Sequence, residues 1–181
     1  MTIFLFLISS LLVNWHADYN IDFGTTKNTQ NWIVVVDGVM GGLSTGKIDW
    51  TDNSISFSGT VSLENNGGFA SIRSPYQSFD LSPFNTVAIR FRAKGQSFAI
   101  TLAKDSRYYM PYYRKNIYPE SEDWQVLEFP ISDFGVYRLG RRSEGEITAE
   151  GLSQVIRLGV ITNDKQPGAF EIEIDYIKFM E

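Results

Sequence analysis

The chain contains no cysteine and a single histidine, His16, and these absences exclude several kinds of chemistry. Without cysteine there is no disulfide, no thiolate nucleophile and no cysteine-based zinc or iron–sulfur site. His16 lies within the first 17 residues, so a chain that begins after that segment has no imidazole for general-base catalysis or metal binding. A pair of carboxylates is the remaining catalytic option, but most of the 21 acidic residues are expected on a solvated face. We therefore predict no catalytic residues, no metal site and no cofactor, and a protein that is not an enzyme.

The sequence also has no long run of lysine or arginine. Its net charge is −5, which is a poor electrostatic match for nucleic acid, so we expect no nucleic-acid partner. Hydrophobic residues make up 43% and aromatic residues 14% of the 181 positions. This composition is typical of one globular domain with a sizeable core.

Long hydrophobic runs are absent apart from residues 3–13, which have about half the length needed to span a bilayer. We predict no transmembrane segment, and we interpret residues 1–17 as a signal peptide that is cleaved between Ala17 and Asp18. The protein would then be exported, to the periplasm or outside the cell, as a single domain of residues 18–181. The lack of a basic residue before the run and the bulk of Trp15 favour the alternatives, a buried first strand or a misassigned start, with a cytoplasmic protein.

Alternation of hydrophobic and polar residues with period 2 dominates the rest of the chain. The alternation that starts at Phe170 shifts its phase by one residue at Tyr176, which predicts a β-bulge. Helical signals are confined to two turns, at 132–134 and at 148–154, where Thr148 is the expected cap. The pattern predicts an all-β, jelly-roll β-sandwich of two antiparallel sheets with at most one or two short helical turns.

Two glycine-rich segments, 37–44 and 64–73, carry polar residues at fixed offsets. Because short strands separate them, we expect both to lie at one end of the sandwich. The sequence Asn65-Asn66-Gly67-Gly68 is typical of a tight hairpin turn with positive φ. Arg73 either pairs with Asp37 or Glu64 or is a free surface arginine. The candidate binding residues of the two segments are Asp37, Ser44, Glu64, Asn65, Asn66 and Arg73.

A tyrosine-rich segment, 107–118, contributes Tyr109, Tyr112 and Arg114 as further candidates. Tyrosine and arginine are enriched at protein interfaces, and tyrosine rings can also stack on sugars. Alternate tyrosines could instead be core residues. Arg138, Arg141 and Arg142 form a local basic spot that suits a carboxylate or phosphate, or else a solvated turn, and Arg138 and Arg141 are its candidate binding residues.

Four blocks carry a resemblance to a known family: 37–44 (DGVMGGLS), 57–73 (FSGTVSLENNGGFASIR), 124–130 (WQVLEFP) and 138–141 (RLGR). In their order and spacing they resemble the complex I intermediate-associated protein 30 family. Membership implies a galactose-binding-like jelly roll. It also implies a non-catalytic factor that assists assembly of the respiratory NADH dehydrogenase. The predicted export signal departs from the mitochondrial members of that family.

Two functions from different classes remain at this point. The first is a non-catalytic, assembly-assisting module that acts through protein–protein contacts, with respiratory complex subunits as candidate partners. The second is a secreted carbohydrate-binding module that uses the tyrosine-rich segment. Exposed, coplanar tyrosines would favour a saccharide, whereas tyrosines divided between core and surface would favour a protein partner.

Overall fold

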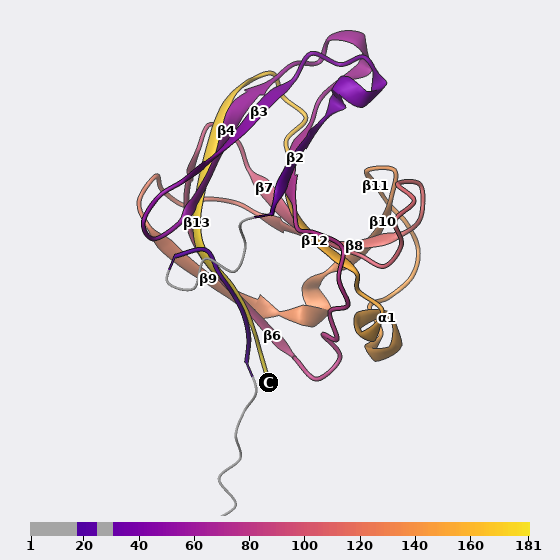
Figure 1. The fold of residues 1–181 in the computed structure, drawn as a ribbon. Helices are drawn as coiled ribbons and strands as arrows, with labels where there is room; N and C mark the ends of the chain where they lie inside the picture. The colour runs from indigo at the N-terminus through magenta and orange to yellow at the C-terminus, as the bar shows by residue number, and fades with distance from the viewer. Residues whose placement is uncertain (1–17, 25–30) are drawn as a thin grey trace, which may run out of the picture.

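The computed structural model describes residues 18–24 and 31–181, and these form a β-sandwich of two antiparallel sheets (Figure 1). The predicted signal peptide lies outside the described residues. The described part contains thirteen strands and one short α-helix, so the expected all-β class and its sparse helical turns are confirmed.

The six-stranded sheet has the order β3–β4–β13–β6–β9, and β1 pairs with the C-terminal half of β13 beside the end of β4. Its hydrophobic residues at alternate positions face the core, and its charged residues face solvent. The strands are β1 (Tyr19–Asp22), β3 (Thr45–Trp50), β4 (Ile55–Val61), β6 (Thr86–Lys94), β9 (Gln125–Pro130) and β13 (Gly168–Met180).

The seven-stranded sheet has the order β11–β10–β8–β7–β12–β5–β2. Its strands are β2 (Ile33–Val36), β5 (Ala70–Arg73), β7 (Phe98–Ala103), β8 (Tyr112–Ile117), β10 (Gly135–Arg138), β11 (Arg141–Arg142) and β12 (Arg157–Thr162).

Aromatic side chains join the two sheets across the core. Phe170 of β13 lies 4.9 Å, between ring centroids, from Phe57 of β4 and 6.2 Å from Phe98 of β7 in the opposite sheet. All three are buried. Burial of an aromatic side chain of this size contributes roughly 1.5–3 kcal/mol, so this contact fixes the sheets face to face.

Short helical turns connect the strands. The helix α1 (Ala149–Ser153) begins where the sequence predicts, with the Thr148 hydroxyl accepting a hydrogen bond from the Gly151 N–H at 3.0 Å. The 3₁₀ turns are η1 (Asp37–Met40), η2 (Glu64–Asn66) and η3 (Ile131–Asp133).

The predicted β-bulge is present in β13. The pairing of β13 with β6 shifts register between Ile174 and Tyr176. On the other edge of β13, β4 pairs up to Ile174 and β1 begins to pair at Tyr176. The bulge therefore marks the point at which β13 changes neighbours.

Candidate functional site

The two glycine-rich segments lie together at one end of the sandwich, at the top of Figure 1, as the sequence predicts. The contact is made by the carboxylate of Asp37, which is fully buried. It accepts hydrogen bonds from the Ser44 N–H at 3.0 Å and the Ser44 hydroxyl at 2.5 Å. From the second segment it accepts the N–H groups of Gly68 at 2.6 Å and Phe69 at 3.3 Å.

These donors determine the charge state of Asp37. Burial alone would raise the pKa of this carboxyl, but the four hydrogen bonds stabilise the ionised form and bring the pKa below its ordinary value. Asp37 is therefore a carboxylate at neutral pH, although no cation pairs with it in the described part of the chain.

Glycine is required around Asp37 because the backbone approaches its carboxylate closely. A Cβ on Gly42 would lie 2.3 Å from one carboxylate oxygen, and a Cβ on Gly67 would lie 2.6 Å from the other. Positive φ values occur in both segments, as expected, at Gly41, Asn65, Asn66 and Gly68, whereas Gly67 itself has a φ of −64°. The second segment is not a hairpin, because it connects β4 in one sheet with β5 in the other.

The predicted ion pair between Arg73 and the turns is absent from the described residues. Ala70 pairs with Val36, the residue directly before Asp37. Arg73 lies three residues further along β5, away from the turns. Its Nε–H donates to the Ser71 hydroxyl at 3.2 Å, and its side chain lies on the outer face of the seven-stranded sheet. The two turns are thus held together by Asp37, with Glu64, Asn65 and Asn66 exposed at the tip.

On the outer face of the seven-stranded sheet, strand register places two arginines in one row across four strands. The row runs from Arg114 on β8 through Thr101 on β7 and Gly159 on β12 to Arg73 on β5. A Cβ on Gly159 would lie 2.8 Å from the Thr101 hydroxyl and 3.5 Å from Cγ of Arg73. The glycine therefore leaves room for Arg73 to lie across the sheet.

One strand further, Gly135 on β10 extends the row beyond Arg114. A Cβ at Gly135 would lie 2.6 Å from a guanidinium nitrogen of Arg142, so this second glycine accommodates a second arginine. A parallel row contains Tyr137, Tyr112, Ala103 and Arg157. We call this surface the arginine–tyrosine face, defined by Arg73, Tyr112, Arg114, Tyr137, Arg142 and Arg157.

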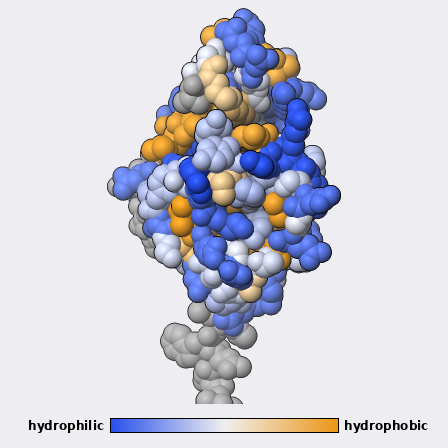
Figure 2. All heavy atoms as spheres, turned by 90° about the vertical axis from the view of Figure 1, so that its right-hand side faces the viewer, coloured by the Kyte–Doolittle hydropathy of each residue, from blue (hydrophilic) through white to orange (hydrophobic). Residues whose placement is uncertain are grey.

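Hydrogen bonds and ring contacts fix these side chains. Arg114, only 9% exposed, donates to the side-chain oxygens of Asn116 (3.1 Å) and Asn163, and its guanidinium lies 5.1 Å from the centre of the Tyr137 ring. Arg157 donates to the Ser74 carbonyl at 2.9 Å and lies 4.2 Å from the centre of the Tyr76 ring. Figure 2 views the molecule from this side and shows mainly hydrophilic side chains across the middle of the face.

Burial lowers the pKa of Arg73, and the charge of Arg157 lowers it further. Both effects disfavour the protonated guanidinium. Since arginine nevertheless remains charged in proteins, Arg73 is a cation held in an unfavourable environment on this face.

The tyrosine-rich segment is divided between core and surface. Tyr113 is buried, Tyr112 is half-buried on the arginine–tyrosine face, and Tyr108 is 76% exposed. The rings of Tyr108 and Tyr109 are nearly perpendicular, with an interplanar angle of 85°. Tyr109 accepts a hydrogen bond at its carbonyl from Arg138 at 3.0 Å. Arg138 and Arg141 are exposed register partners at the β10–β11 edge.

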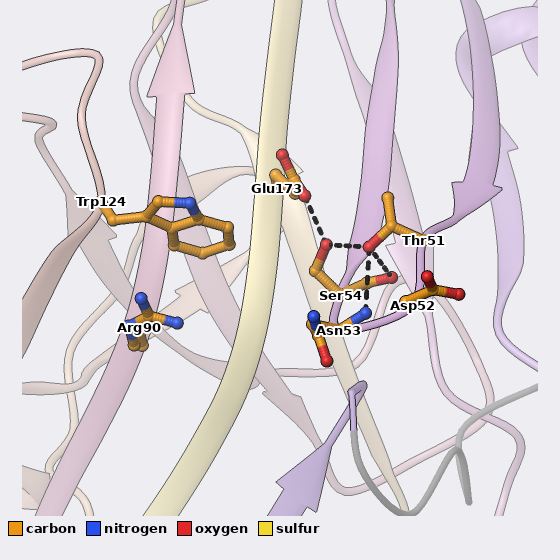
Figure 3. A pocket seen from close by; sticks show the side chains of 7 residues that line it. All are labelled: Thr51, Asp52, Asn53, Ser54, Arg90, Trp124 and Glu173. Atoms are coloured by element: carbon orange, nitrogen blue, oxygen red, sulfur yellow. Dashed lines mark hydrogen bonds between the residues drawn. The ribbon is translucent and has the colours of Figure 1, made fainter.

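The six-stranded sheet carries an open pocket of about 420 Å³ on its outer face (Figure 3). Most of its polar side chains are already engaged with neighbouring residues. Ser54 donates to Glu173 and also bonds to Thr51, while Arg90 lies 4.6 Å from the centre of the Trp124 ring and pairs with Asp175. The charges of Arg90 and Glu173 are therefore compensated by ion pairs, whereas the exposed Asp52 forms no ion pair within the described residues.

The described residues contain no helix that is long and apolar enough to cross a membrane. Within the same residues, no group of three or more histidine, aspartate or glutamate side chains is placed to hold a metal ion.

The profile of the complex I intermediate-associated protein 30 family matches residues 21–174. The mouse mitochondrial protein of that name is 26% identical over 86% of this chain, which spans about half (53%) of its length. Among solved structures, the chain resembles a family 11 carbohydrate-binding module from Clostridium thermocellum, in complex with a β-1,3-1,4-mixed-linked tetrasaccharide. Its TM-score is 0.64 at 19% identity, with 90% of this chain and 94% of the module covered. The xylan-binding module CBM86 from Roseburia intestinalis has a TM-score of 0.50 at 8% identity, covering 91% and 96%. These likenesses confirm the jelly-roll, galactose-binding-like fold.

The sequence placed Arg73, Tyr112 and Arg114 among the candidates and Arg142 in the basic spot, but it did not indicate Tyr137 and Arg157, which lie on the same face. Alternation in β12 puts Arg157 on the side of the strand opposite the buried Leu158. That pattern identifies an outward arginine. Its proximity to Arg73 follows only from the pairing of β12 with β5.

Proposed function

Because the chain belongs to the complex I intermediate-associated protein 30 family, we propose that it is a non-catalytic binding module that assists assembly of a protein complex. The arginine–tyrosine face is the contact surface in this proposal, with Arg73, Tyr112 and Arg114 at its centre. Tyr109, Arg138 and Arg141 flank it at the β10–β11 edge. Asp37 and Ser44 shape the neighbouring turns, whose exposed tip offers Glu64, Asn65 and Asn66. The name of the mouse relative makes subunits of respiratory complex I the candidate partners.

The observation that supports a protein partner is the arrangement of the tyrosine rings. The rings of Tyr76 and Tyr137 lie beside the guanidinium groups of Arg157 and Arg114. Tyr108 and Tyr109 do not share a plane. Flat stacking of consecutive sugar rings needs exposed aromatic faces in line, whereas mixed tyrosine and arginine side chains are typical of protein contacts.

Co-purification from the native host tests this function. Tagged wild-type protein is expected to recover NADH dehydrogenase subunits, identified by mass spectrometry, and Arg73→Gln is expected to recover far less of them. Lys94→Gln removes one positive charge from the other sheet and should behave as wild type. Recovery of envelope proteins alone would contradict the proposed function. Equal recovery by Arg73→Gln would exclude the arginine–tyrosine face as the contact surface and leave the function itself in place.

A second candidate is saccharide binding by the same face. Tyr112 and Tyr137 lie 6.3 Å apart with a tilt of only 32°, so this pair could support one sugar ring beside the hydrogen-bonding groups of Arg114 and Asn116. Electrophoresis through gels that contain mixed-linked β-glucan tests it. Retardation of the wild type that Tyr112→Ala abolishes would support saccharide binding, and unchanged mobility in the polysaccharide would reject it.

A further inference from the structure

Charge is segregated between the two sheets. The strands of the seven-stranded sheet contain six arginines and one lysine but not one aspartate or glutamate. The strands of the six-stranded sheet contain acidic and basic residues in nearly equal numbers. An acidic protein with a net charge of −5 thus keeps one of its two faces free of strand carboxylates.

The arginines of the two sheets also differ in their partners. On the six-stranded sheet, Arg90 pairs with Asp175 and Arg92 pairs with Glu173 at 2.5 Å. On the seven-stranded sheet, none of the arginines of the arginine–tyrosine face forms an ion pair within the described chain. Their hydrogen-bond acceptors are neutral, namely amide, hydroxyl and carbonyl oxygens.

Three carboxylates in the loops next to this sheet are engaged with other partners. Asp105 binds Arg107, Asp133 binds Lys115, and Asp164 accepts hydrogen bonds from Ser97. These contacts leave the positive charge of Arg73 and Arg114 without an internal carboxylate. Since guanidinium groups bind carboxylates through charge-assisted hydrogen bonds, an external carboxylate is the complementary ligand.

The spacing of the arginines indicates the shape of that ligand. Arg114 and Arg73 occupy one row, with β7 and β12 between their strands. Three strand spacings separate them by roughly 14 Å. An extended peptide advances about 3.3 Å per residue and turns alternate side chains to the same side. Carboxylates four residues apart on such a peptide would therefore reach both arginines.

We propose that the arginine–tyrosine face binds an extended, acidic segment of a partner protein, which crosses the strands and carries its carboxylates on alternate residues. This proposal rests on the proposed function and specifies the chemistry of its partner. Arg73 and Arg114 bind two of the carboxylates, and Arg142, whose guanidinium lies over Gly135, is available to the next one. Arg157 contributes positive charge on the side of Arg73.

The probe is an eight-residue peptide in which glutamate alternates with serine, and its control replaces each glutamate with glutamine. Fluorescence anisotropy should show at least tenfold tighter binding of the glutamate peptide and a steep loss of affinity with added salt. The Arg73→Gln/Arg114→Gln double variant should weaken binding at least tenfold. Because Arg114 is buried, Arg73→Gln/Arg157→Gln provides a second double variant, and thermal unfolding of each checks that it is folded. Lys94→Gln is the charge-matched control and should bind as wild type.

Equal binding of the two peptides, binding that is insensitive to salt, or equal loss on Lys94→Gln would overturn the proposal. Tighter binding of polygalacturonate than of the glutamate peptide would assign the face to an acidic saccharide instead. Co-purification separates the two proposals. If both double variants still recover the partner, the acidic-segment proposal fails while the assembly function stands. If the glutamate peptide binds but no protein partner is recovered, the assembly function fails.

Discussion

Asp37 shows how one side chain can position two segments that are about 30 residues apart in sequence. Both segments direct N–H groups at its carboxylate, and these hydrogen bonds hold them together. The Asn65 side chain, which donates to the Gly41 carbonyl at 3.0 Å, and the Ser62 N–H, which donates to the Ser44 hydroxyl at 3.0 Å, add to this contact. A carboxylate has no donor of its own and can accept all of these bonds. The amide of asparagine, in contrast, brings an N–H₂ group into a site that consists of donors.

We therefore predict that Asp37→Asn lowers the free energy of unfolding by about 2–4 kcal/mol at pH 7, because buried donors are left unsatisfied. The lowered pKa of Asp37 sets the pH dependence. A carboxyl whose folded-state pKa is depressed stabilises the protein above its unfolded-state pKa of about 4, and this contribution is lost as pH falls through the folded-state pKa. The difference between wild type and Asp37→Asn should thus shrink below about pH 4.

Denaturant unfolding of both proteins between pH 3 and pH 8 measures this difference. Asp49→Asn, at a surface ion pair with Lys47, is the control and should change stability little at any pH. A constant difference between wild type and Asp37→Asn down to pH 3 would show that Asp37 does not titrate in this way.

At the scale of the element, patterns along a single strand could be predicted from sequence. The phase shift at Tyr176 correctly located the bulge in β13, and Thr148 correctly located the start of α1. The β4–β5 connection was predicted incorrectly. Asparagine and glycine indicate a tight turn with positive φ, but they do not determine whether the next strand pairs with the last one or crosses to the other sheet.

The close packing of Gly67 in the turn between β4 and β5 leads to a second prediction. Gly67→Ala should destabilise the protein by about 1–3 kcal/mol, although its φ is accessible to alanine, because the new Cβ would lie 2.6 Å from Asp37 and 2.8 Å from the Ser62 carbonyl oxygen. Gly38→Ala is the matched control, since the nearest atom to its Cβ would be 3.7 Å away. Thermal unfolding measures the stability of the two variants. If Gly67→Ala were as stable as Gly38→Ala, Asp37 would be able to move away from the new Cβ.

At the scale of the whole molecule, the arginine–tyrosine face is a result of the order of the strands in the sheet. Arg73, Arg114 and Arg157 come from strands far apart in sequence, and the order β8–β7–β12–β5 brings them together. Sequence patterns indicated that each strand has a solvent-exposed face, and they placed two of these arginines among the candidates. They could not show that the exposed face of one sheet contains arginines but no strand carboxylates, because that property depends on which strands share the sheet.

The same segregation predicts that two arginine-to-glutamine substitutions act in opposite directions. Arg73→Gln removes a partly desolvated charge next to Arg157, so it should leave the free energy of unfolding unchanged or raise it by up to about 1 kcal/mol. Arg92→Gln removes the cation that pairs with Glu173, which is only 9% exposed, and should lower the free energy of unfolding by about 1–2 kcal/mol.

Denaturant unfolding at low and high salt measures both variants. Added salt should reduce any gain from Arg73→Gln, since the repulsion from Arg157 is partly screened at the surface. If Arg73→Gln proved as destabilising as Arg92→Gln, Arg73 would be a structural residue of the sheet, comparable to Arg92. If Arg73→Gln instead remained stable but no longer bound the glutamate peptide, Arg73 would be a ligand-binding residue whose repulsion from Arg157 the folded protein tolerates.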